Sequence, residues 1–355
     1  MESMEINTNF WKDKTVFLTG HTGFKGGWIT LWLNKMGAKV HGYGLPPKTK
    51  DNFFSEAKIN QVMASSFIGD INDSGTLLNS IKRVHPEIIF HMAAQPIVRE
   101  SYLSPVSTFK TNIFGTINVL EAARKVNSIK AIVNITTDKC YESREWVWPY
   151  RENDSLGGYD PYSASKACSE LVSASYRNSF FKPQDVHVAT VRAGNVIGGG
   201  DWSNDRLIPD FLRSIDNGKV LKIRSPNSVR PWQHVLEPLS GYLLLAEKLY
   251  EKENSFDEAW NFGPVDEDTK TVRWIVDKLC EKISGVKYEI DISMEPHETH
   301  SLKLDSTKAK SKLGWAPRWN LENALSKTLE WHQAWKNDCD MSAISIKQIL
   351  DYQNS

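Results

Sequence analysis

From residue 14 to about residue 193, short apolar runs alternate with segments whose apolar residues recur at helical spacing. The runs are short and rich in β-branched residues, as in strands that are buried on both faces of a parallel sheet. They predict strands at 15–19, 38–43, 66–69, 88–91, 131–136 and 187–192. The segments between them predict helices near 24–36, 74–84, 105–126 and 161–181. Such alternation predicts an α/β fold, in which helices cover both faces of a parallel sheet.

A glycine-punctuated turn joins the first predicted strand to the first predicted helix. It reads Thr19-Gly20-His21-Thr22-Gly23-Phe24-Lys25-Gly26. Its glycines permit a tight turn, a close approach of the backbone to a ligand, and close packing of helix on strand. Free N–H groups at the helix start would face the pyrophosphate of a dinucleotide. The alternative is a turn without a ligand, but the strand before it and the helix after it favour a doubly wound, Rossmann-type dinucleotide site.

The regular alternation ends after residue 194. Residues 194–232 are rich in Gly, Asn, Asp, Arg and Pro, as expected of substrate-handling loops. A helix near 235–250 and a strand at 259–262 follow. We therefore expect a NAD-binding Rossmann domain of residues 1–193 plus about 233–263, and a smaller mixed α/β lobe of 194–232 and 264–355 that binds the substrate. Four tryptophans of that lobe, at 315, 319, 331 and 335, are expected to pack rather than to stack on a ligand.

Tyr162 and Lys166 stand one helical turn apart, so both side chains project from one face of the predicted helix. We expect the lysine charge to lower the tyrosine pKa from its usual value of about 10. A tyrosine tuned in this way can take a proton from an alcohol as a general base. Alone, this spacing is common on helix surfaces and indicates little.

Composition excludes several classes of function. The chain has 43 basic and 43 acidic residues among 355, so no global field attracts nucleic acid or an anionic membrane. Neither a signal peptide nor a membrane-spanning run is expected. The four scattered cysteines lack metal-binding spacing and indicate reduced thiols in a cytoplasmic protein, so no metal site is expected.

Eight motifs in a fixed order resemble the extended short-chain dehydrogenases/reductases that modify nucleotide sugars. They are Thr19–Gly26, Gly69-Asp70-Ile71, His91-Met92-Ala93-Ala94-Gln95, Asn112-Ile113-Phe114-Gly115, Tyr162 with Lys166, Arg192-Ala193-Gly194-Asn195-Val196, Arg230-Pro231-Trp232-Gln233-His234-Val235 and Lys312-Leu313-Gly314-Trp315. The resemblance covers nearly the whole chain. Within the family, Thr137-Asp138-Lys139, Gly198-Gly199-Gly200-Asp201-Trp202 and Val229–His234 resemble the dehydratases that act on CDP-glucose.

The resemblance implies a role for each matching position. The residues implied to bind the cofactor are Gly20, Thr22, Gly23, Phe24, Lys25, Gly26, Asp70, Ile71, Ala93, Ala94, Gln95, Asn112, Tyr162 and Lys166. Those implied to bind the nucleotide sugar are Thr137, Asn195, Arg206, Arg230 and His234. Arginine suits the substrate's phosphates because its planar fork donates two hydrogen bonds at once. The family commonly forms homodimers through the helices near 105–126 and 161–181, and whether these dimers pair into tetramers is left open.

NAD is the cofactor that the resemblance implies, and NADP stays open. NAD-binding Rossmann folds usually end the second strand with an acid that holds the ribose 2′-hydroxyl. This chain has Gly44-Leu45-Pro46-Pro47-Lys48 there. Lys48 and Lys50 suit a 2′-phosphate, or equally a solvated loop.

The implied reaction converts CDP-D-glucose into CDP-4-keto-6-deoxy-D-glucose. Tyr162 removes the 4-hydroxyl proton while hydride leaves C4, water is lost across C5 and C6, and hydride returns to C6. The related dTDP-glucose dehydratases have Asp-Glu after the threonine, whereas this chain has Asp138-Lys139. Asp138 can act as the acid. Lys139 could act as the C5 base, position a water, or stabilise the enolate electrostatically.

Three rival functions share parts of this pattern. A nucleotide-sugar 4-epimerase shares the turn and the Tyr/Lys pair, but it does not need Asp138 and Lys139. A dehydratase for another nucleotide sugar, such as GDP-mannose, would be expected to carry stronger NADP features. A non-catalytic NAD(P)-binding sensor would commonly lose the Tyr/Lys pair, which this chain retains.

Overall fold

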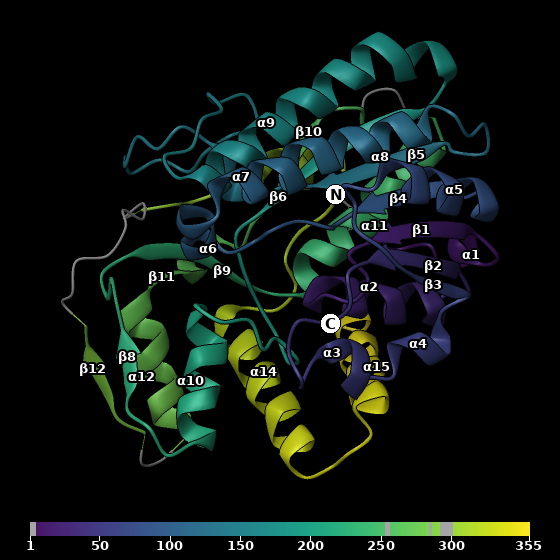
Figure 1. Ribbon diagram of the computed structural model, residues 1–355. Coiled ribbons are helices and arrows are strands. Elements are labelled where there is room, and N and C mark those ends of the chain that lie inside the picture. The colour runs from purple at the N-terminus through teal and green to yellow at the C-terminus, as the bar shows by residue number, and fades with distance from the viewer. Residues whose placement is uncertain (1–4, 253–255, 284–285, 292–300) are drawn as a thin grey trace.

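One large parallel sheet runs through the described residues 5–252, 256–283, 286–291 and 301–355 of this computed structural model (Figure 1). Its strands are β1 (Thr15–Thr19), β2 (Lys39–Gly44), β3 (Ser65–Ile68), β4 (Ile88–His91), β5 (Ala131–Ile135), β6 (His187–Ala193) and β10 (Ala259–Phe262). They lie in the order β10-β6-β5-β4-β1-β2-β3, with every neighbouring pair parallel. The predicted parallel sheet is confirmed, and each predicted strand lies within a residue of its observed position.

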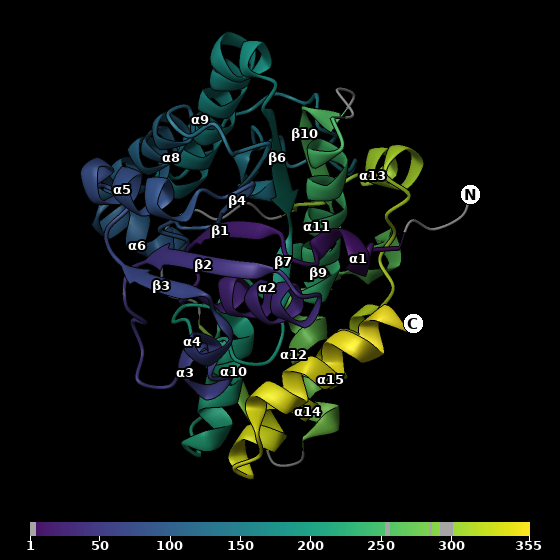
Figure 2. The same ribbon diagram turned by 90° about the vertical axis from the view of Figure 1, so that its right-hand side faces the viewer.

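Helices cover both faces of this sheet because successive strand residues point to opposite sides. Val16 and Leu18 of β1 belong to one buried cluster, and Phe17 belongs to another. The first cluster packs under α2 (Phe24–Lys35) and α11 (Leu236–Tyr250), and the second under α5 (Ser74–Val84), α8 (Gly115–Ala123) and α9 (Pro161–Tyr176). Figure 2 shows these two layers on opposite sides of the sheet.

The two long predicted helices are present, but neither is a continuous α-helix. The first comprises α7 (Pro105–Phe109), a π-helical turn (Lys110–Phe114) and α8. The second is α9 followed by a π-helical turn (Arg177–Phe181). π-turns of this kind are frequent near functional sites, and the first holds Asn112, which faces the sheet.

A smaller mixed α/β lobe is formed by segments on either side of β10 in the chain. Its three-stranded sheet has the order β11 (Thr269–Thr271), β9 (Val229–His234), β7 (Asn195–Ile197), in which β9 runs parallel to β7 and antiparallel to β11. Its two-stranded sheet pairs β8 (Leu221–Ile223) with β12 (Tyr288–Ile290). Helices α10 (Leu207–Asp216) and α12 (Val272–Lys282) pack on these strands around a separate apolar cluster.

The remaining helices surround these two parts. They are α1 (Thr8–Trp11), α3 (Phe53–Glu56), α4 (Ile59–Val62), α6 (Val98–Leu103), α13 (Thr307–Lys312), α14 (Leu321–Lys336) and α15 (Met341–Gln353). Helix α15 packs on α2, so the C-terminal helices extend the core of the large sheet (Figure 2). The division of the chain into 1–193 with 233–263 and 194–232 with 264–355 stays a prediction.

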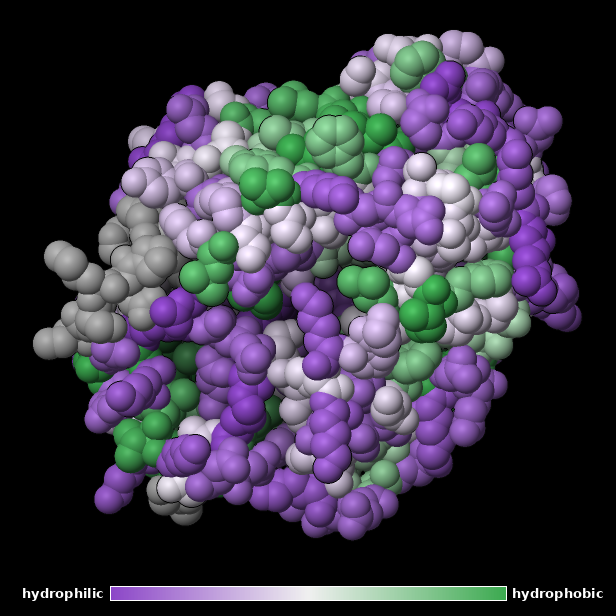
Figure 3. Space-filling view, in the orientation of Figure 1, coloured by the Kyte–Doolittle hydropathy of each residue, from purple (hydrophilic) through white to green (hydrophobic). Residues whose placement is uncertain are grey.

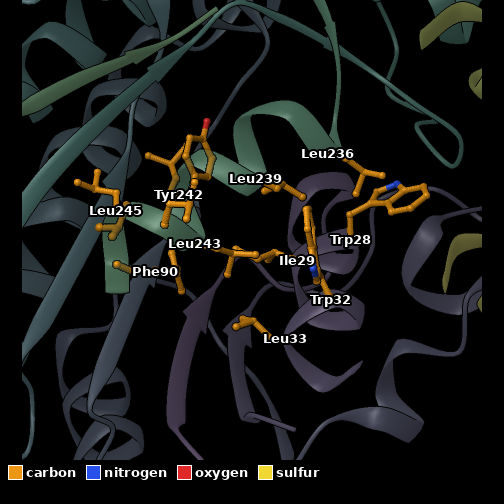
Figure 4. Packing of buried hydrophobic residues seen from close by; sticks show 14 of the residues in the cluster. Trp28, Ile29, Trp32, Leu33, Phe90, Leu236, Leu239, Tyr242, Leu243 and Leu245 are labelled. Atoms are coloured by element: carbon orange, nitrogen blue, oxygen red, sulfur yellow. The ribbon is translucent and has the colours of Figure 1, made fainter. Parts of the chain in front are cut away.

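The C-terminal tryptophans pack against this main core. Trp331 stacks near Phe53, with 5.9 Å between the ring centroids, and the Trp315 indole donates a 2.9 Å hydrogen bond to Ser240. Figure 4 shows the same core where α2 and α11 meet, with Trp28 and Leu236 side by side. Packing, rather than ligand stacking, therefore accounts for these indoles.

Candidate active site

The carboxyl ends of the parallel strands bring the predicted motifs to one edge of the sheet, which is where open α/β sheets bind ligands. The glycine turn follows β1, Asp70 follows β3, Ala93 follows β4, and Thr137 follows β5. The turn after β1 and the segment after β4 are in close contact, because a Cβ placed on Gly20 would lie 2.8 Å from the backbone nitrogen of Ala93.

The glycine turn has the shape that a dinucleotide requires. Gly20 has a φ of +79°, which disfavours other residues, and a Cβ on Gly26 would lie 2.2 Å from the Gly20 carbonyl oxygen. The helix start at Gly23 has no side-chain cap, which leaves the first N–H groups of α2 for a ligand. The cradle therefore fits the pyrophosphate of a nicotinamide dinucleotide.

Several predicted cofactor residues act on the surrounding backbone. The Thr22 hydroxyl donates to the Leu45 carbonyl at 2.7 Å, and Asp70 accepts from the Asn72 amide at 2.9 Å. Gln95 and Asn112 form two hydrogen bonds with each other. The backbone N–H of Gln95 donates to Asn112 Oδ1 at 2.9 Å, and Asn112 Nδ2 donates to the Gln95 carbonyl oxygen at 3.1 Å. Asn112 also donates to Ser165 of α9 at 2.8 Å, so it ties the end of β4 to the helix that carries Tyr162.

Tyr162 and Lys166 lie together on the buried face of α9, as their spacing predicts. Asp160 caps this helix by accepting from the Ser163 amide at 2.9 Å, and Pro161 occupies its first position. The Lys166 ammonium donates to the Ile135 carbonyl at the end of β5, at 3.0 Å. This bond places the lysine beside the turn of Thr137, Asp138 and Lys139, which follows β5.

The predicted low pKa of Tyr162 is wrong. Burial raises the pKa of Tyr162 to about 12, and the opposing contributions are a hydrogen bond with Thr137 and the charge of Arg206. Burial also lowers the pKa of Lys166 to about 8, although the Glu170 carboxylate acts in the other direction. Desolvation is the largest cause of both shifts, and the spacing of the two residues along the helix does not reveal it.

Thr137, Asp138 and Lys139 form a tight turn directly after β5. The Thr137 hydroxyl donates to Asp138 Oδ1 at 3.0 Å and accepts from the Lys139 amide at 3.3 Å. Asp138 is 2% exposed, and its Oδ2 has no hydrogen-bond partner in the described part of the chain. The next residue, Cys140, is buried and its pKa is raised by that burial, which keeps its thiol protonated and unreactive.

Charged side chains of the glycine turn and of the smaller lobe lie close together. Burial lowers the pKa of Lys25 to about 7, and the charge of Arg206 adds to this effect. Arg206 Nη1 lies 3.5 Å from Asp201 Oδ2 at the start of α10. Lys25 was predicted from the glycine motif alone, and its proximity to Arg206 and Asp138 is a finding of the structure.

The other predicted substrate residues separate into two groups. Asn195 opens β7 and lies beside Trp232 of β9, and Arg230 is a buried residue of β9. His234, in contrast, is fully buried among aromatic rings, 4.9 Å from Trp319 between ring centroids. Burial lowers the pKa of His234 to about 3, so its ring is neutral and does not join the others at the ligand edge.

Sequence reasoning missed a buried ion pair that lies next to the turn after β5. Arg192 and Glu170 form it at 2.9 Å, and both side chains are about 3% exposed. Glu170 follows Lys166 by four residues, a spacing that was available in the sequence. Beyond this pair a surface cleft of about 480 Å³ opens between α9 and α13, away from Tyr162.

Two further searches concern the described residues only. No helix among them is long and apolar enough to cross a bilayer. No group of three or more His, Cys, Asp or Glu side chains in those ranges is arranged to hold a metal ion.

The sheet, the glycine turn and the Tyr/Lys pair define an extended short-chain dehydrogenase/reductase of the class that modifies nucleotide sugars. Solved structures with the same fold include a UDP-glucose 4-epimerase from Thermotoga maritima (TM-score 0.78, 24% identity, 90% of this chain and 99% of that chain). A dTDP-glucose 4,6-dehydratase from Bacillus anthracis, in complex with NAD, has a TM-score of 0.76 at 22% identity, over 91% of this chain and 98% of that chain. At these identities the likeness shows the fold alone.

The chain belongs to the family described as GDP-mannose 4,6 dehydratase, whose family model matches residues 17–328. A CDP-glucose 4,6-dehydratase from Salmonella typhimurium is 54% identical over 356 residues, covering 99% of each chain. A dTDP-glucose 4,6-dehydratase from Escherichia coli is 28% identical over 293 residues, covering 74% of this chain and 78% of that protein. The predicted family is thereby confirmed.

Proposed function

We propose that this protein is a lyase that dehydrates CDP-D-glucose to CDP-4-keto-6-deoxy-D-glucose, with NAD as its cofactor. The observation that carries the proposal is that Thr137, in the turn after β5, hydrogen-bonds both Tyr162 of α9 and Asp138. A base, Tyr162, and an acid, Asp138, therefore lie at one place. The relative named CDP-glucose 4,6-dehydratase supports the choice of substrate through its 54% identity over nearly the full length of both chains.

In this proposal Tyr162 takes the proton of the sugar's 4-hydroxyl. A bound nicotinamide supplies the acceptor for the C4 hydride and later returns that hydride to C6. Because burial holds the Tyr162 pKa near 12, the phenolate must be stabilised as the proton moves. The positive charge of Arg206 acts in that direction, and so does the Thr137 hydroxyl once its single proton turns from Asp138 Oδ1 to the phenolate oxygen.

Loss of water requires an acid at O6 and a base at C5. Asp138 is the proposed acid, since its Oδ2 is unused within the described part of the chain and Thr137 fixes its other oxygen. Lys139 is the proposed base, which takes the C5 proton and later returns a proton there. An electrostatic role for its ammonium at the C5 enolate is the alternative, and isotope exchange at C5 separates the two.

The cofactor and substrate residues follow the predicted assignment with one exception. The glycine turn, Asp70, Ile71 and the backbone at Ala93 and Ala94 are proposed to hold the dinucleotide. Asn195, Arg206 and Arg230 are proposed to hold the diphosphate of the nucleotide sugar, and Lys25 adds positive charge beside them. His234 is left out because it lies in the aromatic core. Without an acid at the end of β2, NADP stays open as the cofactor.

A homodimer is part of the same proposal. Large apolar side chains lie exposed along the two predicted dimer helices and their neighbours, at Leu103, Val106, Phe114, Leu171 and Phe180. Figure 3 shows apolar residues gathered on the upper face of the molecule, where Figure 1 places α8 and α9. Exposed apolar patches of this kind mark interfaces, and two copies would form a four-helix bundle here.

A cytoplasmic location is also proposed. The four cysteines are free, which fits a reducing compartment. No nucleic-acid or membrane partner is proposed, since the chain has no net charge to attract one.

The direct test supplies the purified protein with NAD and, separately, with CDP-, dTDP-, UDP- and GDP-linked hexoses, and follows product mass. Loss of one water from CDP-glucose alone is the expected result. An isomer of unchanged mass would instead indicate an epimerase. No conversion of any sugar, with NADP also tried, would contradict the enzyme assignment and favour a binding protein.

A further inference from the structure

The buried pair Arg192–Glu170 contacts the catalytic turn on both sides. Before the turn, the Thr136 hydroxyl donates to Glu170 Oε1. After the turn, Arg192 Nη1 donates to the Tyr141 hydroxyl at 2.8 Å. Thr137, Asp138, Lys139 and Cys140 are the residues between these two anchors, so one ion pair contacts both ends of the segment that carries the proposed acid and base.

The Glu170 carboxylate is fully used. Besides Thr136, it accepts from Arg192 Nε and Nη2, both at 2.9 Å, and from the Thr190 hydroxyl at 2.6 Å. A carboxylate with four donors and a bidentate arginine has little freedom to shift. Glu170 also acts on Lys166, which lies one helical turn before it. The negative charge of Glu170 raises the pKa of Lys166 and so partly offsets the lowering by burial.

The arginine end is equally fixed. Arg192 Nη1 also donates to the Glu152 carbonyl at 3.1 Å, and its guanidinium lies 4.8 Å from the centre of the Tyr141 ring. The Tyr141 hydroxyl in turn donates to Asn261 Oδ1 of β10 at 2.7 Å. The catalytic turn is thus tied to α9 and to the strands on its other side.

We propose that Glu170 and Arg192 are positioning residues for the elimination step, which hold the Thr137–Lys139 turn so that Asp138 and Lys139 reach the sugar together. The inference rests on the proposed function. Proton removal by Tyr162 uses one residue of the turn, Thr137, whereas elimination uses Asp138 and Lys139, which must both reach the sugar. Loosening the turn should therefore slow elimination more than the first oxidation, and a misplacement of about 1 Å can cost on the order of a hundredfold in rate.

The chain supplies a matched pair of substitutions for the test. Thr136→Val and Thr190→Val each remove one buried hydroxyl that donates to Glu170, but only Thr136 borders the catalytic turn. Thr136→Ser restores the hydroxyl, and Tyr141→Phe loosens the other end of the turn without touching the carboxylate. Each variant is assayed with NAD and CDP-glucose for product formation, melting temperature, and the near-ultraviolet absorbance of reduced nicotinamide during turnover.

The expected result is a tenfold or greater loss of product formation in Thr136→Val, on the order set by small misplacements, together with more reduced nicotinamide during turnover than in the wild type. Tyr141→Phe should behave alike, Thr136→Ser should return to the wild-type values, and Thr190→Val should lower the melting temperature without the absorbance change. Equal effects of Thr136→Val and Thr190→Val would show a purely structural role and overturn the inference. A wild-type protein that leaves CDP-glucose unchanged would overturn the proposed function itself, and this inference with it.

Discussion

Replacing Gly26 by alanine is expected to disrupt the dinucleotide site. The new Cβ would lie 2.2 Å from the Gly20 carbonyl oxygen and 2.8 Å from His21 Cα, where ordinary contacts begin near 3.4 Å. All of these neighbours are backbone atoms, so no side chain can rotate away. Helix α2 must therefore move by about 1 Å relative to the turn after β1.

The size of the effect follows from that movement. Overpacking of a filled site costs up to about 3 kcal/mol of unfolding free energy. A chain of 355 residues has an unfolding entropy of about 0.7 kcal/mol/K, so the melting temperature should fall by about 4 °C. A displacement of about 1 Å misaligns the helix N–H groups with the pyrophosphate, and loss of one such charge-assisted hydrogen bond, worth about 1.5–3 kcal/mol, should weaken NAD binding by roughly 10- to 100-fold.

Gly75→Ala is the matched control. Gly75 also lies in the first turn of a helix, α5, but a Cβ there would meet only Asp73 Oδ1, at 3.5 Å. Alanine is favoured over glycine in a helix by about 0.5–1 kcal/mol, so this variant should melt about 1 °C higher and bind NAD normally. Calorimetric titration with NAD and thermal melting of both variants test the reasoning. Wild-type affinity and melting temperature in Gly26→Ala would refute it.

Three further predictions concern single side chains. Tyr162→Phe should slow formation of reduced nicotinamide on mixing with substrate by about 10²–10⁴-fold, and an unchanged rate would remove Tyr162 as the base. Lys139→Ala should spare cofactor binding but slow deuterium incorporation from solvent at C5, whereas unchanged incorporation would exclude Lys139 as the C5 base. Glu237→Gln should increase stability at pH 8 relative to the wild type and change little at pH 4. Burial raises the pKa of Glu237 to about 7 from an ordinary 4.5. The folded state therefore binds more protons than the unfolded state, and the wild type loses stability as the pH rises from about 4.5 through 7. This difference is on the order of 3 kcal/mol, and parallel denaturant titrations of both proteins in which it is absent would contradict the assignment.

The large sheet could be predicted from the sequence because its strands leave a local signal. Each strand is a short apolar run that is buried on both faces, and each helix between them has its own apolar periodicity. The small elements of the second lobe, such as β7 and β11 with three residues each, are too short for a recognisable period. The packing of α15 on α2 joins residues about 300 positions apart, and no local pattern encodes it.

The candidate site was predictable where motifs carry backbone requirements, as in the glycine turn and in the spacing of Tyr162 and Lys166. Electrostatics were not predictable, because desolvation depends on burial: the expected low pKa of Tyr162 is instead raised to about 12. Motif membership also did not indicate the surroundings of His234, whose ring packs against Trp319. The pairing of Glu170 with Arg192 was missed because an ion pair between a helix and a strand is visible only in the folded chain.

The central claim is that one bound cofactor carries hydrogen from C4 to C6 of the same sugar while Asp138 and Lys139 remove water between them. The most direct test incubates the protein and NAD with CDP-glucose that carries deuterium at C4, mixed with unlabelled substrate, and examines the product by mass spectrometry and NMR. The account predicts that each labelled molecule loses one water, keeps its deuterium, and carries it at C6. Deuterium that is lost to solvent, is transferred to unlabelled molecules, or remains at C4 would contradict the account.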